Sequence, residues 1–255
     1  MMKVALIQTS LEWEDPEANR AHFSRLIHTL DGEVDLIVLP EMFTTGFTMN
    51  PEHIPYEEAE RTLDWMRENV TRTGSALAGS LIFQEAGQYF NRLVFMFPNG
   101  DYEYYDKRHT FTLAGEDKVY QRGNERKIVR FRGLTFSLQI CYDLRFPVWS
   151  RNTVDYDVLL YVANWPHTRI AAWDALLRAR AIENMSYVLG VNRIGSDDNG
   201  LRYQGHSAVY DALGERLAFS DMEEILYVTL DKKSVEQVRT TLKFLQDRDT
   251  FTLES

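Results

Sequence analysis

Cys141 is the residue of this chain whose type and position most clearly suggest chemistry. It is the only cysteine in 255 residues, and it directly follows the apolar run from Leu134 to Ile140. Such a run predicts a buried strand, and the functional groups of α/β proteins gather at the carboxyl ends of buried strands. Because a thiolate there can attack a carbonyl carbon, we expect Cys141 to be a nucleophile.

Two further ionisable residues follow strand-like runs in the same way. Glu41 comes directly after Asp-Leu-Ile-Val-Leu-Pro, and Lys107 comes after Tyr-Glu-Tyr-Tyr-Asp. A carboxylate in a dry pocket can take the proton of a thiol, while an ammonium group and the backbone N–H of Tyr142 can hold the oxyanion of a tetrahedral intermediate. Together the three side chains predict acyl transfer, in which Glu41 is the base and Lys107 the oxyanion donor.

The elements that must position these residues alternate between strands and helices. Helices are expected over 16–30, 57–73 and 171–185, where apolar residues recur every three or four positions, and Asp15-Pro16 is typical of a helix start. Strands are expected at Val4–Ile7, Leu36–Leu39, Ser75–Phe83, Leu93–Phe97, Ile128–Phe131, Leu134–Ile140, Val158–Ala163, Tyr187–Asn192, Ala208–Tyr210 and Ile225–Leu230. This order predicts an α/β fold.

The arrangement of the strands is less closely specified. Strands near both ends alternate with helices, whereas residues 75–106 and 206–230 look like hairpins, so a mixed sheet is expected. Two facing sheets with helices outside fit this pattern, and a barrel is the alternative. Residues 1–255 are expected to form one domain, with 242–255 as a C-terminal arm.

The composition of the chain indicates its cellular compartment and excludes some classes of partner. One cysteine allows no internal disulfide, which favours a reducing compartment and a cytoplasmic protein, and the sequence has no spacing typical of a metal site. No signal peptide and no membrane-spanning run is expected. A net charge of -10 argues against a nucleic-acid partner.

The three candidate residues lie in motifs that resemble a known family. Leu-Pro-Glu41, Tyr-Asp-Lys107-Arg-His and Cys141-Tyr-Asp-Leu-Arg-Phe-Pro, in this order, look like the Glu-Lys-Cys triad of the nitrilase superfamily of carbon–nitrogen hydrolases. Two later blocks, Tyr161-Val-Ala-Asn-Trp-Pro166 and Asn192-Arg-Ile-Gly-Ser196, are similar to its ω-amidase branch. The resemblance runs nearly end to end.

This resemblance implies a four-layer α-β-β-α sandwich that forms a homodimer and needs no cofactor. It also implies hydrolysis of a small-molecule amide through a thioester, with ammonia released from ω-amides of α-keto dicarboxylates such as α-ketoglutaramate. A second catalytic glutamate is implied near the thiol, and it maps to Glu116 in Leu-Ala-Gly-Glu-Asp.

Several side chains near the predicted strand ends are candidates for substrate binding. They are Tyr142, Phe43, His109, Arg145, Trp165 and His167. A guanidinium group can bind the free carboxylate of an ω-amide through two hydrogen bonds, which makes Arg145 the most informative of them. The alternative is that Arg145 stabilises the turn after Cys141 by pairing with Asp143 or Glu183.

Other functions remain open at this point. A Cys-His hydrolase would use a histidine as the base, although no histidine lies in a context typical of such enzymes. Another carbon–nitrogen hydrolase, acting on N-carbamoyl amino acids or nitriles, would use the same triad. A non-catalytic small-molecule binding protein is the third alternative.

Overall fold

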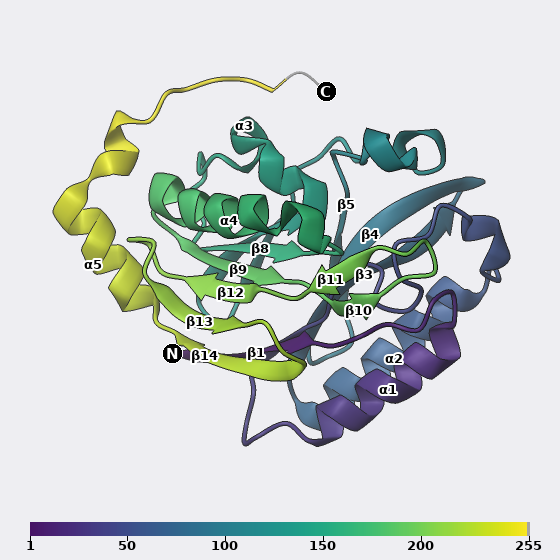
Figure 1. Ribbon diagram of the computed structural model, residues 1–255. Coiled ribbons are helices and arrows are strands. Elements are labelled where there is room, and N and C mark those ends of the chain that lie inside the picture. Colours follow the sequence, from purple (N-terminus) through teal and green to yellow (C-terminus); the bar gives the residue numbers. More distant parts are fainter. Residues whose placement is uncertain (254–255) are drawn as a thin grey trace.

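The computed structural model describes residues 1–253, and most of its strands form two six-stranded sheets (Figure 1). The first sheet has the order β14-β1-β2-β3-β4-β5. Its strands are β1 (Met2–Gln8), β2 (Leu36–Val38), β3 (Ala76–Glu85), β4 (Gln88–Met96), β5 (Tyr102–Asp106) and β14 (Glu224–Leu230). Strands β1, β2 and β3 are parallel and the other neighbours are antiparallel, which confirms the expected mixed sheet.

The second sheet has the order β13-β12-β9-β8-β7-β6. Its strands are β6 (Ile128–Phe131), β7 (Leu134–Ile140), β8 (Val158–Val162), β9 (Tyr187–Val191), β12 (Ser207–Tyr210) and β13 (Arg216–Ser220). Strands β7, β8 and β9 are parallel, so their carboxyl ends meet at one edge. A separate short hairpin joins β10 (Ile194–Ser196) to β11 (Arg202–Gln204). Because the strands belong to two sheets, the barrel alternative is wrong.

Helices flank both sheets on their outer faces and at the ends of the sandwich (Figure 1). They are α1 (Pro16–His28), α2 (Glu58–Thr73), α3 (Pro147–Ser150), α4 (Ile170–Asn184) and α5 (Lys232–Leu242). The expected helix start is confirmed, since the Asp15 side chain accepts a hydrogen bond from the amide of Ala18 at 3.0 Å and Pro16 follows it. Short 3-10 helices are η1 (Pro51–His53), η2 (Thr112–Ala114), η3 (Glu116–Lys118), η4 (Cys141–Arg145), η5 (His167–Arg169) and η6 (Phe244–Asp247).

Successive side chains of a strand point to opposite faces of its sheet, so each sheet packs against the other sheet on one face and against helices on the other. In β1, Val4 and Leu6 belong to the core between the two sheets, while Ala5 and Ile7 pack in the cluster that contains Phe23 of α1. On the other side, a Cβ atom at Gly190 of β9 would lie 2.5 Å from Leu177 of α4, so only glycine allows this close approach. These contacts give the helix-sheet-sheet-helix order of an α-β-β-α sandwich.

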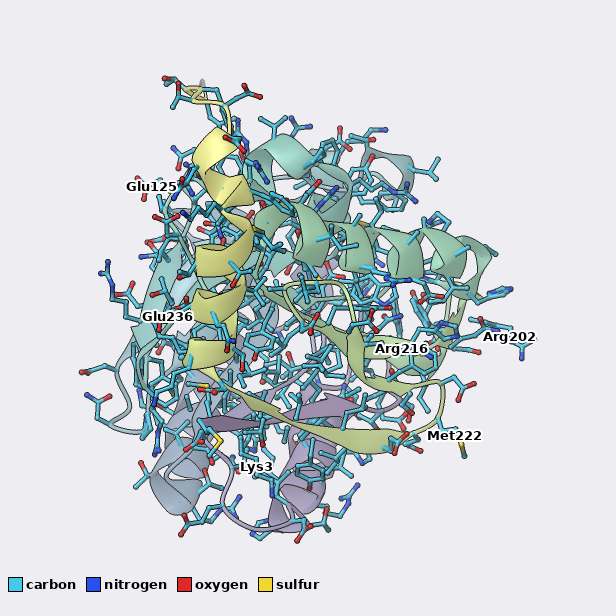
Figure 2. The ribbon with its side chains drawn as sticks, turned by 90° about the vertical axis from the view of Figure 1, so that its left-hand side faces the viewer. Lys3, Glu125, Arg202, Arg216, Met222 and Glu236 are labelled. Carbon is cyan, nitrogen blue, oxygen red and sulfur yellow. The ribbon has the colours of Figure 1, made fainter. Side chains whose placement is uncertain are left out.

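The C-terminal segment folds back over the same chain. Figure 2 shows α5 crossing one side of the molecule, with Glu236 on its exposed side. Beyond it, Arg248 donates to the carbonyl of Asn152 at 3.0 Å and pairs with Asp155 at 2.6 Å. Of the predicted arm, residues 254–255 lie outside the described part. Among residues 1–253, no helix combines the length and apolar character needed to cross a membrane.

Candidate active site

The residues predicted to act together come from three strand ends that meet. Glu41 follows β2, Lys107 follows β5, and Cys141 follows β7. Lys107 Nζ lies 2.8 Å from Glu41 Oε1, and both side chains are buried. Cys141 lies near both, since the charges of Glu41 and Lys107 act on the pKa of its thiol. The fold therefore brings a carboxylate, an ammonium group and a thiol into one cluster.

The turn that carries Cys141 has an uncommon backbone conformation. The φ angle of Cys141 is 43°, in the left-handed region that a non-glycine residue adopts only when its surroundings hold it there. Asp143 provides much of that support, because its buried carboxylate accepts hydrogen bonds from the amide of Ile140 at 3.0 Å and the hydroxyl of Tyr105 at 2.8 Å. It also accepts from the amide and Nδ1 of His109 at 3.0 and 2.7 Å.

The same turn is supported from α4. Arg180 donates to the carbonyl of Leu144 at 2.7 Å and pairs with Glu183 at 2.9 Å. Arg180, and not Arg145, is therefore the arginine that stabilises the turn, and the alternative pairing of Arg145 with Asp143 or Glu183 is wrong. Both carboxylates already have other partners.

Glu116 completes the charged cluster from η3. Both of its carboxylate oxygens accept hydrogen bonds from Lys107 Nζ, at 3.0 and 2.9 Å. Glu116 is buried and the neighbouring Asp117 is exposed, so the side chain that reaches Lys107 is that of Glu116. Burial raises the pKa of Glu116, as does the charge of Glu41, while the ammonium group of Lys107 opposes the rise.

Electrostatics keep Lys107 charged and Cys141 neutral in the resting protein. Burial acts to lower the pKa of Lys107, but the negative charges of Glu116 and Glu41 outweigh it and raise the pKa overall. Burial and the charge of Glu41 raise the pKa of the Cys141 thiol well above its ordinary value. The thiol therefore becomes nucleophilic only when a base removes its proton, and Glu41 is the carboxylate whose charge acts most strongly on it.

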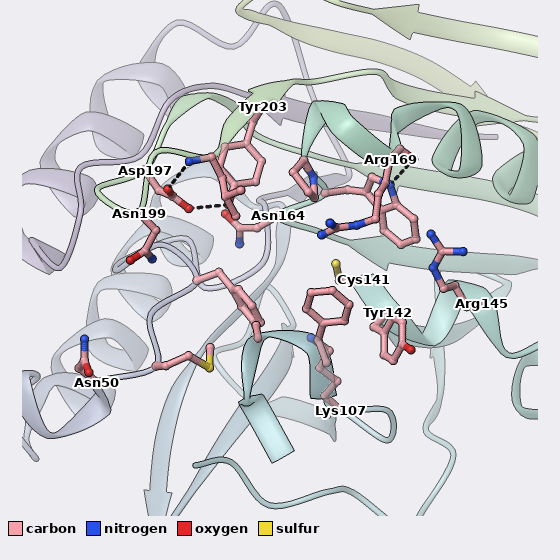
Figure 3. A pocket seen from close by; sticks show the side chains of 17 residues that line it. Asn50, Lys107, Cys141, Tyr142, Arg145, Asn164, Arg169, Asp197, Asn199 and Tyr203 are labelled. Atoms are coloured by element: carbon pink, nitrogen blue, oxygen red, sulfur yellow. Dashed lines mark hydrogen bonds between the residues drawn. The ribbon is translucent and has the colours of Figure 1, made fainter. Parts of the chain in front are cut away.

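A cavity of about 410 Å³ opens onto Cys141 and Lys107 (Figure 3). Its walls combine aromatic side chains with a few charged and amide groups, as in small-molecule sites. The lining residues are Phe47, Met49, Asn50, Lys107, Phe111, Ala114, Cys141, Tyr142, Arg145, Asn164, Trp165, Pro166, Arg169, Asp197, Asn199, Leu201 and Tyr203. Three of the predicted substrate-binding residues, Tyr142, Arg145 and Trp165, are among them.

The other three predicted substrate-binding residues do not line this cavity. Phe43 is buried in the core, where its ring lies 5.6 Å from that of Phe23. His109 is held against Asp143 and stacks on Phe146 at 3.8 Å. His167 lines a separate hollow beside Ile194 and His206. Their placement therefore argues against the expected contact of these side chains with a substrate beside Cys141.

Several cavity residues were not predicted from the sequence. Asn164 follows β8, and a signal for it was present in the block from Tyr161 to Pro166, where a polar residue follows an apolar run, whereas Arg169 lies in η5 beyond that block. The β10–β11 hairpin supplies Asp197 and Tyr203, whose hydroxyl donates to the Asp197 carboxylate at 2.8 Å. The block from Asn192 to Ser196 includes β10, but no local signal placed the hairpin against the cavity, because that position depends on the packing of distant elements.

Comparisons with known proteins agree with this geometry. The family model for carbon-nitrogen hydrolases matches residues 3–240. The omega-amidase YafV of Yersinia enterocolitica is 45% identical over 254 residues, which cover 99% of this chain and 98% of that protein. A 2-oxoglutaramate amidase of Bacillus subtilis is 30% identical, with 96% of each chain covered.

A solved structure gives the same result for the fold. XC1258 of Xanthomonas campestris, described as a CN-hydrolase superfamily protein with an arsenic adduct in the active site, superposes with a TM-score of 0.96 at 39% sequence identity. The match covers 99% of both chains. The chain therefore belongs to the carbon–nitrogen hydrolase family, in the ω-amidase branch of the nitrilase superfamily, and is a hydrolase of carbon–nitrogen bonds other than peptide bonds.

Proposed function

We propose that this protein is a cysteine-dependent amidohydrolase that releases ammonia from ω-amides of α-keto dicarboxylates, α-ketoglutaramate among them. Such a substrate has an amide at one end and a carboxylate at the other, so its site needs a nucleophile and a separate anion-binding group. The omega-amidase and 2-oxoglutaramate amidase relatives carry names that fit this substrate class.

The observation that carries the proposal is a pair of arginines in the cavity of Cys141. Arg145 and Arg169 both line it, and Figure 3 shows them near Cys141, with Asp197 and Asn199 farther along. Within residues 1–253, neither guanidinium group has a carboxylate at ion-pair distance. Each instead lies 5.0 Å from an aromatic ring centre, Arg145 over Trp165 and Arg169 over Phe111. Stacking leaves their N–H edges free to bind a substrate carboxylate.

In the proposed mechanism, Glu41 takes the proton of Cys141 as the sulfur attacks the amide carbon. The ammonium group of Lys107 and the backbone amide of Tyr142 stabilise the oxyanion. The Tyr142 amide is available because it lies in the first turn of η4, where backbone amides have no carbonyl of a preceding turn to bind. Glu41 then protonates the leaving nitrogen, and ammonia departs. A water activated by Glu41 hydrolyses the thioester, with Glu116 holding Lys107 in place.

The assembly and setting are part of the same proposal. We propose one carbon–nitrogen hydrolase domain over 1–255, with 242–255 as a C-terminal arm, in a cytoplasmic homodimer. Neighbouring exposed apolar side chains on α4 and the β12–β13 turn support a dimer, namely Ile182 and Leu213, which are each 49% exposed, with Ile182 against Gly214, the residue next to Leu213. Light scattering would test the dimer, and a monomer at micromolar concentration would contradict it.

Ammonia release from a panel of compounds tests the function. The panel is α-ketoglutaramate, succinamate, glutamine, an N-carbamoyl amino acid and a nitrile, with Cys141→Ala as the control. We expect the fastest release from α-ketoglutaramate and none from the variant. Faster release from the carbamoyl compound or the nitrile would move the protein to another activity of the same family, and no turnover of any compound would favour a binding role.

A further inference from the structure

Asn91, a residue of β4, lies at the centre of the buried charge cluster that Glu41, Lys107 and Glu116 form. Its side chain is fully buried. The Nδ2 group donates to Glu41 Oε1 at 2.8 Å and to Glu116 Oε1 at 3.3 Å. Its backbone carbonyl accepts the amide of Lys107 at 3.0 Å. One residue therefore contacts all three charged residues of the cluster.

The orientation of the Asn91 amide is fixed by its neighbours. Ionised carboxylates only accept hydrogen bonds, so a flipped amide would place its oxygen against two negative groups. In the observed orientation, the Asn91 Oδ1 atom is buried and has no hydrogen-bond partner within the described residues. A buried unpartnered oxygen destabilises a fold, and an apolar side chain of similar shape would avoid that cost. The presence of an amide at this position therefore points to a role for its two donated bonds.

Those bonds make the two oxygens of Glu41 unequal. Oε1 accepts from Asn91 Nδ2 and from Lys107 Nζ, each at 2.8 Å. Oε2 accepts from the backbone amide of Asn164, also at 2.8 Å. Because a carboxylate oxygen offers about two acceptor positions, Oε1 is saturated and Oε2 has one position open.

We propose that Asn91 is a positioning residue that directs the proton of Cys141 to Oε2 of Glu41 by occupying Oε1 together with Lys107. This inference rests on the proposed function only for the identity of the substrate. When Sγ attacks, the S–H bond breaks, its proton goes to Oε2, the C–S bond forms and the carbonyl π pair moves to oxygen. When the C–N bond breaks, the same proton moves from Oε2 to the leaving nitrogen, and ammonia is released.

The titratable groups that face this cluster are few. Lys107 donates to Glu41, Glu116 accepts from Asn91, and the charge of Glu41 acts on the thiol of Cys141. The charge of Glu116 acts on the phenol of Tyr120, and the charge of Glu41 acts on the phenol of Tyr203. Burial raises the pKa of both phenols, so they stay neutral in the pH range of the test.

Asn91→Asp tests the inference because it keeps the shape and removes the donors. At neutral pH the new carboxylate would repel Glu41, Glu116 and a forming thiolate, so we expect alkylation of Cys141 by iodoacetamide to slow by about 10- to 100-fold. As the pH falls, the buried aspartate takes up a proton and regains one donor. The ratio of variant to wild-type rates should therefore rise toward one at acid pH. Turnover should follow the same profile.

Asn69→Asp is the matched control, since Asn69 is a buried residue of α2 whose Oδ1 accepts from Arg72 at 2.7 Å. It should keep the wild-type pH profile. If Asn91→Asp fails to fold, Asn91→Ser takes its place. A serine hydroxyl can donate to only one of the two carboxylates, so the decline of the alkylation rate toward low pH should begin at a higher pH than in the wild type. If either Asn91 variant folds and its alkylation rate has the same pH dependence as that of the wild type, the inference is overturned.

The two readouts separate this inference from the proposed function. Alkylation needs no substrate, and the single cysteine ensures that all label reports on one thiol. A shifted alkylation profile without turnover of any amide would support the role of Asn91 and contradict the ω-amidase proposal. An unshifted profile in an active ω-amidase would do the reverse.

Discussion

Replacement of Lys107 by methionine would leave two buried carboxylates, Glu41 and Glu116, without their shared cation. Lys107 Nζ lies 2.8 Å from Glu41 and 2.9 Å from Glu116, and its side chain has no exposed surface. Removing one partner of a buried ion pair lowers the free energy of unfolding by about 3–5 kcal/mol. For a chain of this length, that loss corresponds to a fall of about 10 °C in Tm.

The pH dependence of this loss has a defined sign. Burial already raises the pKa of Glu116, and without the ammonium group the pKa rises further. The folded variant then binds more protons than the unfolded chain between the unfolded and folded pKa values, so its stability falls as the pH rises through the folded pKa. The loss relative to the wild type should therefore be larger at pH 7.5 than at pH 5.5.

Urea unfolding followed by tryptophan fluorescence at both pH values would measure this difference. Lys127→Met is the matched control, because Lys127 pairs with Glu103 at 2.7 Å but both side chains are partly exposed, so the loss should be at most about 1 kcal/mol. Equal stability of Lys107→Met and wild type at pH 7.5, or a loss that grows toward pH 5.5, would refute the reasoning.

Three further predictions concern the cavity, the turn and the pH profile. Arg169→Met should lower kcat/KM for an ω-amide with a distal carboxylate by about 10- to 100-fold, as measured by ammonia release. It should leave an amide without that carboxylate nearly unaffected, and equal losses would contradict the proposed anion site. Asp143→Asn should lower the free energy of unfolding by about 3 kcal/mol in urea, because its NH₂ group would face donors, and an unchanged midpoint would count against this role. Glu116 holds Lys107 through its ionised carboxylate, and burial raises the pKa of that carboxylate above the ordinary 4.5. We therefore expect kcat/KM to fall with decreasing pH around a midpoint above that value, and a midpoint at or below it would be inconsistent with the cluster.

Features that depend on neighbouring residues in the sequence could be predicted well. The apolar runs before Cys141 and Glu41 indicated buried strands, and each residue lies at the carboxyl edge of the parallel strands of its own sheet. Asp15-Pro16 marked the start of α1 because the capping interaction is local.

Features set by turn geometry and long-range packing could not be predicted. After Glu41 the chain turns at Met42, whose φ is 43°, so Phe43 enters the core and Phe47 reaches the cavity. In η5 a difference of two positions separates His167 from Arg169, and only Arg169 lines the cavity. Asn91 and Arg92 are adjacent polar residues in β4, and sequence alone cannot distinguish a solvent-facing side chain there from one that donates to two buried carboxylates.

Quantitative alkylation of Cys141 tests the central claim most directly, because the chain has a single thiol and every label reports on it. Aliquots would be labelled to increasing extents with iodoacetamide, and mass spectrometry would give the labelled fraction of each. The same aliquots would be assayed for ammonia release from α-ketoglutaramate. We predict that activity falls in proportion to the labelled fraction and that substrate slows the labelling. Full activity in fully labelled protein would contradict the assignment of Cys141 as the nucleophile.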